Sequence, residues 1–155
     1  MTLAVALSVL GASPAVAQSV CGLTATAMAF GNYSAVLGTA VNTTATLTMT
    51  CTNNTNAADT VNYSISLATG VGGGYNPRRM TAGAERLNYN IFRNNARTQI
   101  WGNGTGGTQV VTGSFNVPRN QTRTRNVTAY GQIISNQDAS QGDYVDTVTA
   151  TATFN

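Results

Sequence analysis

Residues 41–51 read VNTTATLTMTC, and polar side chains occupy every second position of this stretch. The even positions carry asparagine and then threonine, whereas the odd positions are mostly apolar and end at Cys51. A period of two is typical of a β-strand that buries one face and exposes the other. The same alternation predicts strands over 61–67, 87–91 and 144–154, with weaker candidates at 23–30, 109–117 and 126–134.

Clusters of glycine, asparagine and proline separate these runs and predict turns. They fall at 31–32, 53–54, 70–77, 102–107, 118–121 and 136–142. No window has the spacing of a long amphipathic helix, and we find no internal repeat or linker. About seven short strands joined by turns predict an all-β protein, an immunoglobulin-like antiparallel β-sandwich of one domain.

The composition argues against an enzyme and against a nucleic-acid binder. Charged residues make up 8% of the chain, and histidine is absent. Without histidine the chain lacks the commonest proton shuttle near neutral pH and cannot build Ser-His-Asp or Cys-His nucleophile systems. Two cysteines alone are too few for the usual zinc sites, and a net charge of +3 without a dense basic face does not favour nucleic acid. We therefore expect no catalytic residue, no cofactor and no metal.

Asp138, Asp143 and Asp146 lie close together in the sequence and are the best candidates for an acid pair or for calcium ligands. Their spacing matches no calcium-loop motif, so we expect them in turns or at the start of a strand. We also expect Asp143 or Asp146 to pair with Arg78 or Arg79, in a structural role. The sequence thus predicts no activity that depends on these carboxylates.

The N-terminus has the features of a secretory signal peptide. Residues 3–10 are apolar, and residues 15–17 (AVA) fit a cleavage site of small residues before Gln18. We predict a signal peptide over residues 1–17 and a mature domain over 18–155. Because the usual basic residues are missing ahead of the apolar run, we expect the true start to lie further upstream. No later stretch approaches about 20 apolar residues, so we expect an exported protein without a transmembrane anchor.

Cys21 and Cys51 are the two cysteines of the chain. An even number of cysteines in an exported protein predicts one disulfide. Closing a loop of this size would stabilise the fold by about 3–4 kcal/mol in the chain-entropy model. Two buried free thiols are the alternative interpretation of the same pair.

Several short motifs follow one another in order along the chain. They are FGNY at 30–33, YSISL at 63–67 with Gly70 after it, RRM at 78–80, LNYNIF at 87–92, ARTQIWG at 96–102, YGQI at 130–133 and GDYVDTV at 142–148. Together with the two cysteines, this ordered set resembles the spore coat protein U domain family, which also contains the pilins of Csu-type (archaic) chaperone–usher fimbriae. The resemblance covers residues 21–155.

This resemblance implies an incomplete, donor-strand-accepting sandwich that lacks its last strand. In such pilins the gap is filled first by a strand of a periplasmic chaperone and then by the N-terminal extension of the next subunit. Strand addition of this kind takes its affinity from main-chain hydrogen bonds and its specificity from pockets for alternate side chains. The implied partners are a periplasmic chaperone, an outer-membrane usher and neighbouring pilus or coat subunits. The implied location is a cell-surface fimbria or a secreted coat, reached through the periplasm.

The C-terminal run places Val148, Ala150, Ala152 and Phe154 on one face and threonines on the other. By the same resemblance, this strand is expected to dock the chaperone or the neighbouring subunit. An ordinary inner strand of the sandwich is the alternative, and the two roles are compatible.

The predicted cleavage site leaves little chain for donating a strand. If cleavage follows Ala17, three residues precede Cys21 and span about 10 Å, which is too short to fill a groove several residues long. Such a chain would cap a fibre, act as a secreted coat-type protein, or use residues 23–30 in some other way. The alternative function is a secreted monomeric module that binds carbohydrate or a surface through Trp101 and the glycine-rich loop 102–107.

Overall fold

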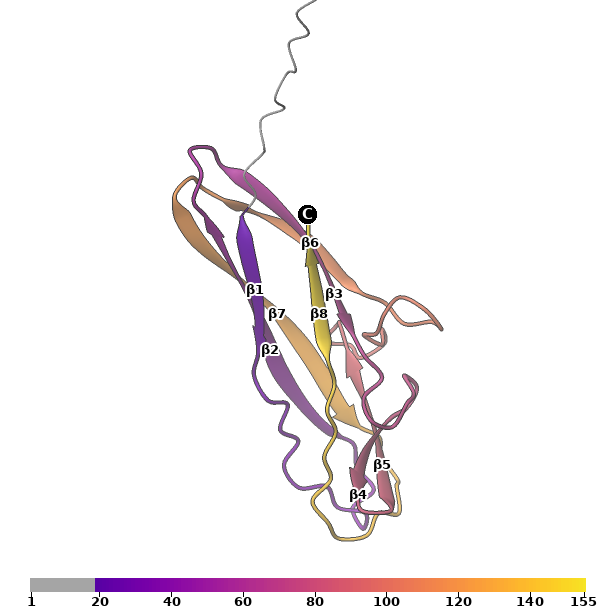
Figure 1. Cartoon of the computed structure of the whole chain (residues 1–155). Coiled ribbons are helices and arrows are strands. Elements are labelled where there is room, and N and C mark those ends of the chain that lie inside the picture. Colours follow the sequence, from indigo (N-terminus) through magenta and orange to yellow (C-terminus); the bar gives the residue numbers. More distant parts are fainter. Residues whose placement is uncertain (1–18) are drawn as a thin grey trace, which may run out of the picture.

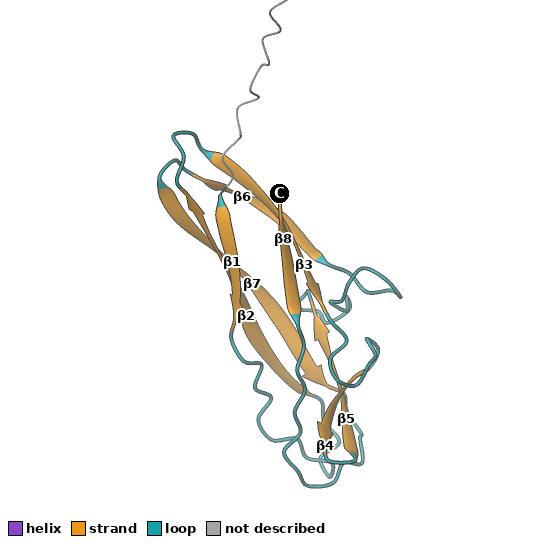
Figure 2. Ribbon diagram, viewed as in Figure 1, coloured by secondary structure: helices purple, strands orange, loops and turns teal. Residues whose placement is uncertain are grey.

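The computed structural model describes residues 19–155, so the predicted signal peptide lies outside the described residues. Within that range the chain forms strands and loops and no helix (Figure 2). No described helix therefore has the length and apolar character that a membrane crossing requires. The strands are β1 (Val20–Ala25), β2 (Val41–Asn53), β3 (Asp59–Leu67), β4 (Arg78–Ala82), β5 (Glu85–Phe92), β6 (Val111–Val117), β7 (Gln121–Ile133) and β8 (Ala150–Phe154).

Two antiparallel sheets form the layers of the molecule (Figure 1). Five strands make the first sheet in the order β1-β2-β7-β5-β4, and three make the second in the order β6-β3-β8. The longest pairing joins β2 to β7 over thirteen residues on each strand. The arrangement confirms the predicted all-β, immunoglobulin-like sandwich.

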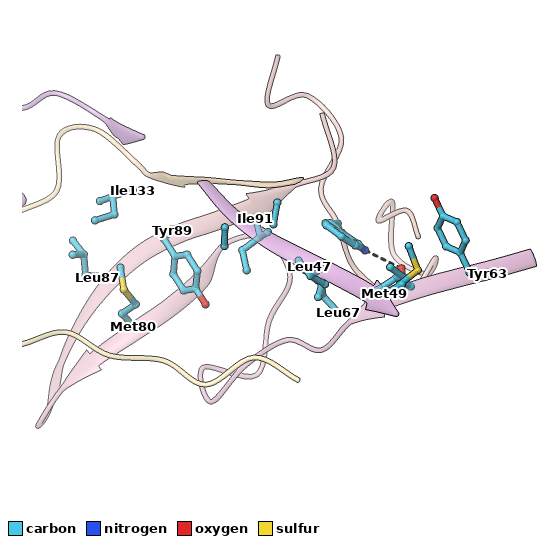
Figure 3. Packing of buried hydrophobic residues seen from close by; sticks show 13 residues of the cluster. Leu47, Met49, Tyr63, Leu67, Met80, Leu87, Tyr89, Ile91 and Ile133 are labelled. Carbon is cyan, nitrogen blue, oxygen red and sulfur yellow. Dashed lines mark hydrogen bonds between the residues drawn. The ribbon is translucent and has the colours of Figure 1, made fainter. Parts of the chain in front are cut away.

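The alternation in residues 41–51 places side chains as predicted. In β2, Ala45, Leu47, Met49 and Cys51 are buried, whereas the threonines between them are half-buried or exposed. Side chains from both sheets meet in one main core (Figure 3), and burying a large aliphatic side chain contributes about 1.5–3 kcal/mol. A smaller cluster of Cys51, Val61 and Val117 lies beside it.

The last predicted strand is shorter than its alternating pattern. Residues 147–154 alternate without interruption, but the strand begins at Ala150. Val145 instead exchanges two backbone hydrogen bonds, of 2.9 and 3.0 Å, with Thr81 of β4 in the five-stranded sheet. Four residues later, Thr149 O accepts a hydrogen bond from Ala68 N, next to β3 in the other sheet. The chain therefore crosses from one sheet to the other between Val145 and Thr149. Because of this crossing, β8 begins only at Ala150.

Strand β4 was not predicted at all. Its first two residues, Arg78 and Arg79, interrupt the apolar pattern on which the prediction rested. Arg78 is nevertheless fully buried, because distant backbone carbonyls surround its guanidinium. These contacts join residues that are far apart in the sequence, so no local sequence pattern predicts them.

Candidate functional site

Strands β1 and β8 are edge strands of different sheets and run side by side on one flank of the sandwich (Figure 1). Each is hydrogen-bonded along one side only, β1 to β2 and β8 to β3. Among the described residues, no strand bridges the two edges.

The backbone of β8 presents alternate residues to the open side. Asn155 and Asn62 exchange two backbone hydrogen bonds, of 2.8 and 2.9 Å, which makes them a hydrogen-bonded pair. In an antiparallel ladder such pairs alternate with pairs that share no hydrogen bond. The N–H and C=O groups of Ala150, Ala152 and Phe154 therefore point away from β3 and into the gap.

The backbone of β1 faces the gap in the same way. Thr26 N donates to Thr46 O at 2.9 Å, which sets the phase of the ladder with β2. By the same alternation, the backbone groups of Cys21, Leu23 and Ala25 face β8 across the gap. Both margins of the gap thus carry free donors and acceptors, as any open sheet edge does.

An apolar groove of about 430 Å³ continues from the gap: it lies between residues 25–30, which follow on from β1, and residues 144–150, which lead into β8. Its deep wall comes from both sheets, and Figure 3 shows several of the core side chains that form it. These include Leu47, Leu67, Met80, Tyr89 and Ile91. A second cavity of about 840 Å³, between residues 28–33 and 139–145, shares Met28, Phe30, Met80, Tyr144 and Val145 with the groove. The core side chains of the deep wall are themselves buried, whereas Met28, Phe30 and Tyr144 at the rim of the groove are half-covered.

The side chains of β8 face the core as predicted. Ala150, Ala152 and Phe154 are half-buried, as is Val148 just before the strand, and all four pack against the core. The threonines at 147, 149, 151 and 153 are exposed. Phe154 also touches the small cluster at Cys51, Val61 and Val117. Because these apolar residues are only half-covered, a strand laid into the groove would bury more of them.

The predicted disulfide is present. Cys21 and Cys51 are bonded and lie directly opposite each other on β1 and β2. The Cα atoms are 4.1 Å apart, the close spacing of a cross-strand pair without mutual hydrogen bonds. The bond holds the edge strand β1 to the body of the sheet at the end where Phe154 packs.

Asp146 anchors the segment that crosses between the sheets. Tyr89 Oη donates to Asp146 Oδ2 at 2.6 Å, and the backbone N–H groups of Val71 and Thr147 donate to Oδ1 at 2.7 and 2.8 Å. Gly70, with φ of 81°, packs so closely on this carboxylate that a Cβ there would overlap it. The carboxylate therefore fixes the position at which the chain enters the groove wall before β8.

Replacing Tyr89 by phenylalanine should change how stability depends on pH. Burial, and then the hydrogen bond to Asp146, raise the pKa of Tyr89 above its usual value. A raised pKa in the fold means that stability is present below the unfolded-state pKa of about 10 and is lost as the pH rises beyond it. Between pH 9 and pH 10.5 this residue alone should lower the free energy of unfolding by about 0.8 kcal/mol.

Urea unfolding of wild type and Tyr89→Phe at these two pH values measures the effect. The variant should lose stability at pH 9, because the hydroxyl that caps Asp146 is gone, by roughly 1 kcal/mol. It should then lose about 0.8 kcal/mol less than wild type on going to pH 10.5. Equal losses in the two proteins would show that Tyr89 titrates normally in the fold.

The expected pairing of Asp143 or Asp146 with Arg78 or Arg79 is wrong. Asp146 takes its hydrogen bonds from Tyr89 and two backbone amides, and Asp143 is exposed. The Arg78 guanidinium instead donates to Ala68 O, Trp101 O and Asn90 Oδ1 at 2.9, 2.7 and 2.8 Å. Burial lowers the pKa of Arg78, and the nearby Asp146 charge acts in the opposite direction. The arginine joins three backbone segments rather than forming an ion pair.

Neither the aspartates nor Trp101 form a binding site in the described part of the chain. Asp138 and Asp143 are exposed, and residues 19–155 hold no group of three or more potential metal ligands. Trp101 is fully buried, and its Nε1 donates to Ile65 O at 2.9 Å. The indole is therefore a core side chain, which removes the aromatic platform on which the carbohydrate-binding alternative rested.

Fold and site together define an immunoglobulin-like sandwich with one apolar groove between two unpaired strand edges. The model of the Spore Coat Protein U domain matches residues 6–151. The chain belongs to this family. No curated protein matches this chain.

The chain is also similar to a solved structure from Acinetobacter baumannii. This is a chain of the CsuC–CsuE complex, described as a pre-assembly complex of the chaperone and the tip adhesion subunit of archaic chaperone–usher Csu pili. The TM-score is 0.55 at 22% sequence identity, and the match covers 86% of this chain. It covers 39% of the other chain, so the likeness concerns the fold of one part of that protein. Family and fold together support a pilus or coat subunit.

Proposed function

We propose that the chain is an exported structural subunit of a surface fimbria or coat, assembled by donation of a strand into the groove between β1 and β8. A periplasmic chaperone would fill the groove first, and a neighbouring subunit would replace it at an outer-membrane usher. The observation that carries the proposal is the pair of unpaired strand edges with the groove that continues from them: both edges carry free backbone groups, and half-covered apolar side chains line the groove.

The physical chemistry of the groove suits an extended peptide. Along β8, the groove-facing backbone groups belong to the residues whose side chains line the core, so an added strand can pair with the backbone and pack its alternate side chains inward. Apart from Asp146, every residue that lines the groove is neutral. The Asp146 carboxylate is already satisfied by three hydrogen bonds, so it does not oppose an apolar strand.

Expression of the exported subunit with and without a candidate chaperone from the same gene cluster tests this function. Light scattering on the purified material should give a one-to-one complex with the chaperone. Without the chaperone, the subunit should be recovered poorly or as self-associated material, because open strand edges and half-covered apolar side chains favour association. If the subunit is instead a stable monomer that does not bind the chaperone, the result favours the alternative function of a secreted binding module.

A further inference from the structure

The flank of the sandwich opposite the groove also has open strand edges. Strand β6 pairs only with β3, and residues 121–129 of β7 pair only with β2. Strand β5 reaches β7 only from Tyr130 onward. Two unpaired edges therefore border this flank as well, and by backbone geometry alone it could accept a strand.

The open edge of β7 can be assigned residue by residue. Ile134 N donates to Asn88 O at 3.2 Å, which sets the phase of the ladder between β5 and β7. Even-numbered residues of β7 thus turn their backbone groups toward the β5 side. Beyond the end of β5, the N–H and C=O groups of Thr122, Thr124, Asn126 and Thr128 are the ones that an added strand would meet.

The side chains on the inner face of this edge differ from those of the groove. Arg123 pairs with Cys51, and Arg125 pairs with Met49. Cross-strand partners lie on the same face of a sheet, and both partners here are fully buried core residues. The two arginines therefore leave the backbone on the core-facing side, yet both are exposed. A charged residue that points inward at an edge is a recognised barrier to edge pairing.

We propose that Arg123 and Arg125 close this second flank to strand addition, so that each subunit accepts a strand only in the groove between β1 and β8. A strand added to β7 would cover two like charges two residues apart and remove them from water. Burying an unpaired charge is strongly unfavourable, and no such cost arises in the groove, whose one charged residue, Asp146, is already hydrogen-bonded. The inference rests on the proposed function: one accepting site per subunit produces an unbranched chain of subunits, whereas two would branch it.

The test uses the chaperone complex, in which the groove is filled. Wild type, Arg123→Val/Arg125→Val, Arg123→Lys/Arg125→Lys and Thr122→Val/Thr124→Val are compared by light scattering across a concentration series. The threonine pair raises the apolar character of the outer face of the same strand and controls for general stickiness. The lysine pair keeps the charge.

We expect wild type, the lysine pair and the threonine pair to remain one-to-one complexes. The concentration at which the valine pair self-associates should be at least about tenfold lower than the concentration at which wild type does. Hydrogen exchange should show new protection at the amides of Thr122, Thr124 and Asn126 in the valine pair alone. If the valine pair behaves as wild type does, or if the threonine pair associates equally, the arginines do not guard this edge.

If the proposed function is wrong, wild type itself forms no complex with the chaperone, and this result is distinct from those above. The comparison is then made on the free proteins, where protection of the β7 amides reports on this edge regardless of the groove. Protection in the valine pair and not in wild type supports the inference. The inference is overturned if these amides are protected in wild-type assemblies and removal of the arginines weakens that protection. The flank would then be a contact surface between subunits.

Discussion

Phe154→Ala should lower the affinity of the subunit for its chaperone by roughly 3- to 13-fold in Kd, which corresponds to about 0.7–1.5 kcal/mol, because binding adds only the remaining half of the side chain's burial. Phe154 is half-buried at the open edge of β8 and packs against the cluster at Cys51, Val61 and Val117. A strand laid beside β8 would complete its burial, so the phenyl ring contributes more to the complex than to the free subunit. Pull-down of the co-expressed, tagged chaperone measures the loss.

Thr151→Ala is the matched control for this prediction. Thr151 lies on the same strand, but its side chain is exposed on the opposite face. Its replacement should change binding and stability by well under about 1 kcal/mol. Circular dichroism and complete disulfide formation would establish that both variants fold. If folded Phe154→Ala co-purifies with the chaperone as well as wild type does, the docking role of this strand is wrong.

Loss of the Cys21–Cys51 disulfide should cost about 3–4 kcal/mol of stability. The cysteines are 30 residues apart in sequence, and opening that loop increases the conformational entropy of the unfolded chain. It also frees β1, which forms one margin of the groove and is held to the sheet by β2 alone. The reduced subunit should therefore unfold at a lower urea concentration and bind the chaperone less well.

Reduced wild type and Cys21→Ala/Cys51→Ala should both show this loss in urea unfolding. The alanine pair should be slightly the less stable, because it also leaves a small void at the fully buried Cys51. Thiol labelling of denatured, unreduced protein should find no free cysteine. Two labelled thiols per chain, or an unfolding midpoint unchanged by reduction, would contradict the prediction.

The strands with strict alternation were predictable because burial of one face follows directly from a period of two. Residues 41–51 and 61–67 form β2 and β3 close to their expected bounds. Strand β4 was missed, because Arg78 is buried by carbonyls that belong to other parts of the chain. The run at 144–149 was also assigned to a strand, because the alternation of 150–154 extends back to Thr147. Its backbone instead pairs with β4 at Val145 and then crosses to β3.

The groove could not be predicted from any local sequence pattern. It exists because β1 and β8 end their sheets on the same flank, and topology of that kind depends on strand order rather than on any motif. The half-buried row from Val148 to Phe154 could be read from alternation, and the family resemblance supplied its expected role. The hydrogen bonds of Asp146 could not be predicted, since Tyr89 and Val71 are far from it in sequence.

Hydrogen exchange along β8, measured in the free subunit and in the chaperone complex, tests the central claim most directly. The amides of Thr151 and Thr153 face β3 and should be protected in both states. The amides of Ala150, Ala152 and Phe154 face the open groove, so they should exchange fast in the free subunit and slowly in the complex. This alternating gain of protection is what strand addition at the groove predicts. A complex in which the groove-facing amides exchange as fast as in the free subunit, or a free subunit in which they are already protected, would contradict it.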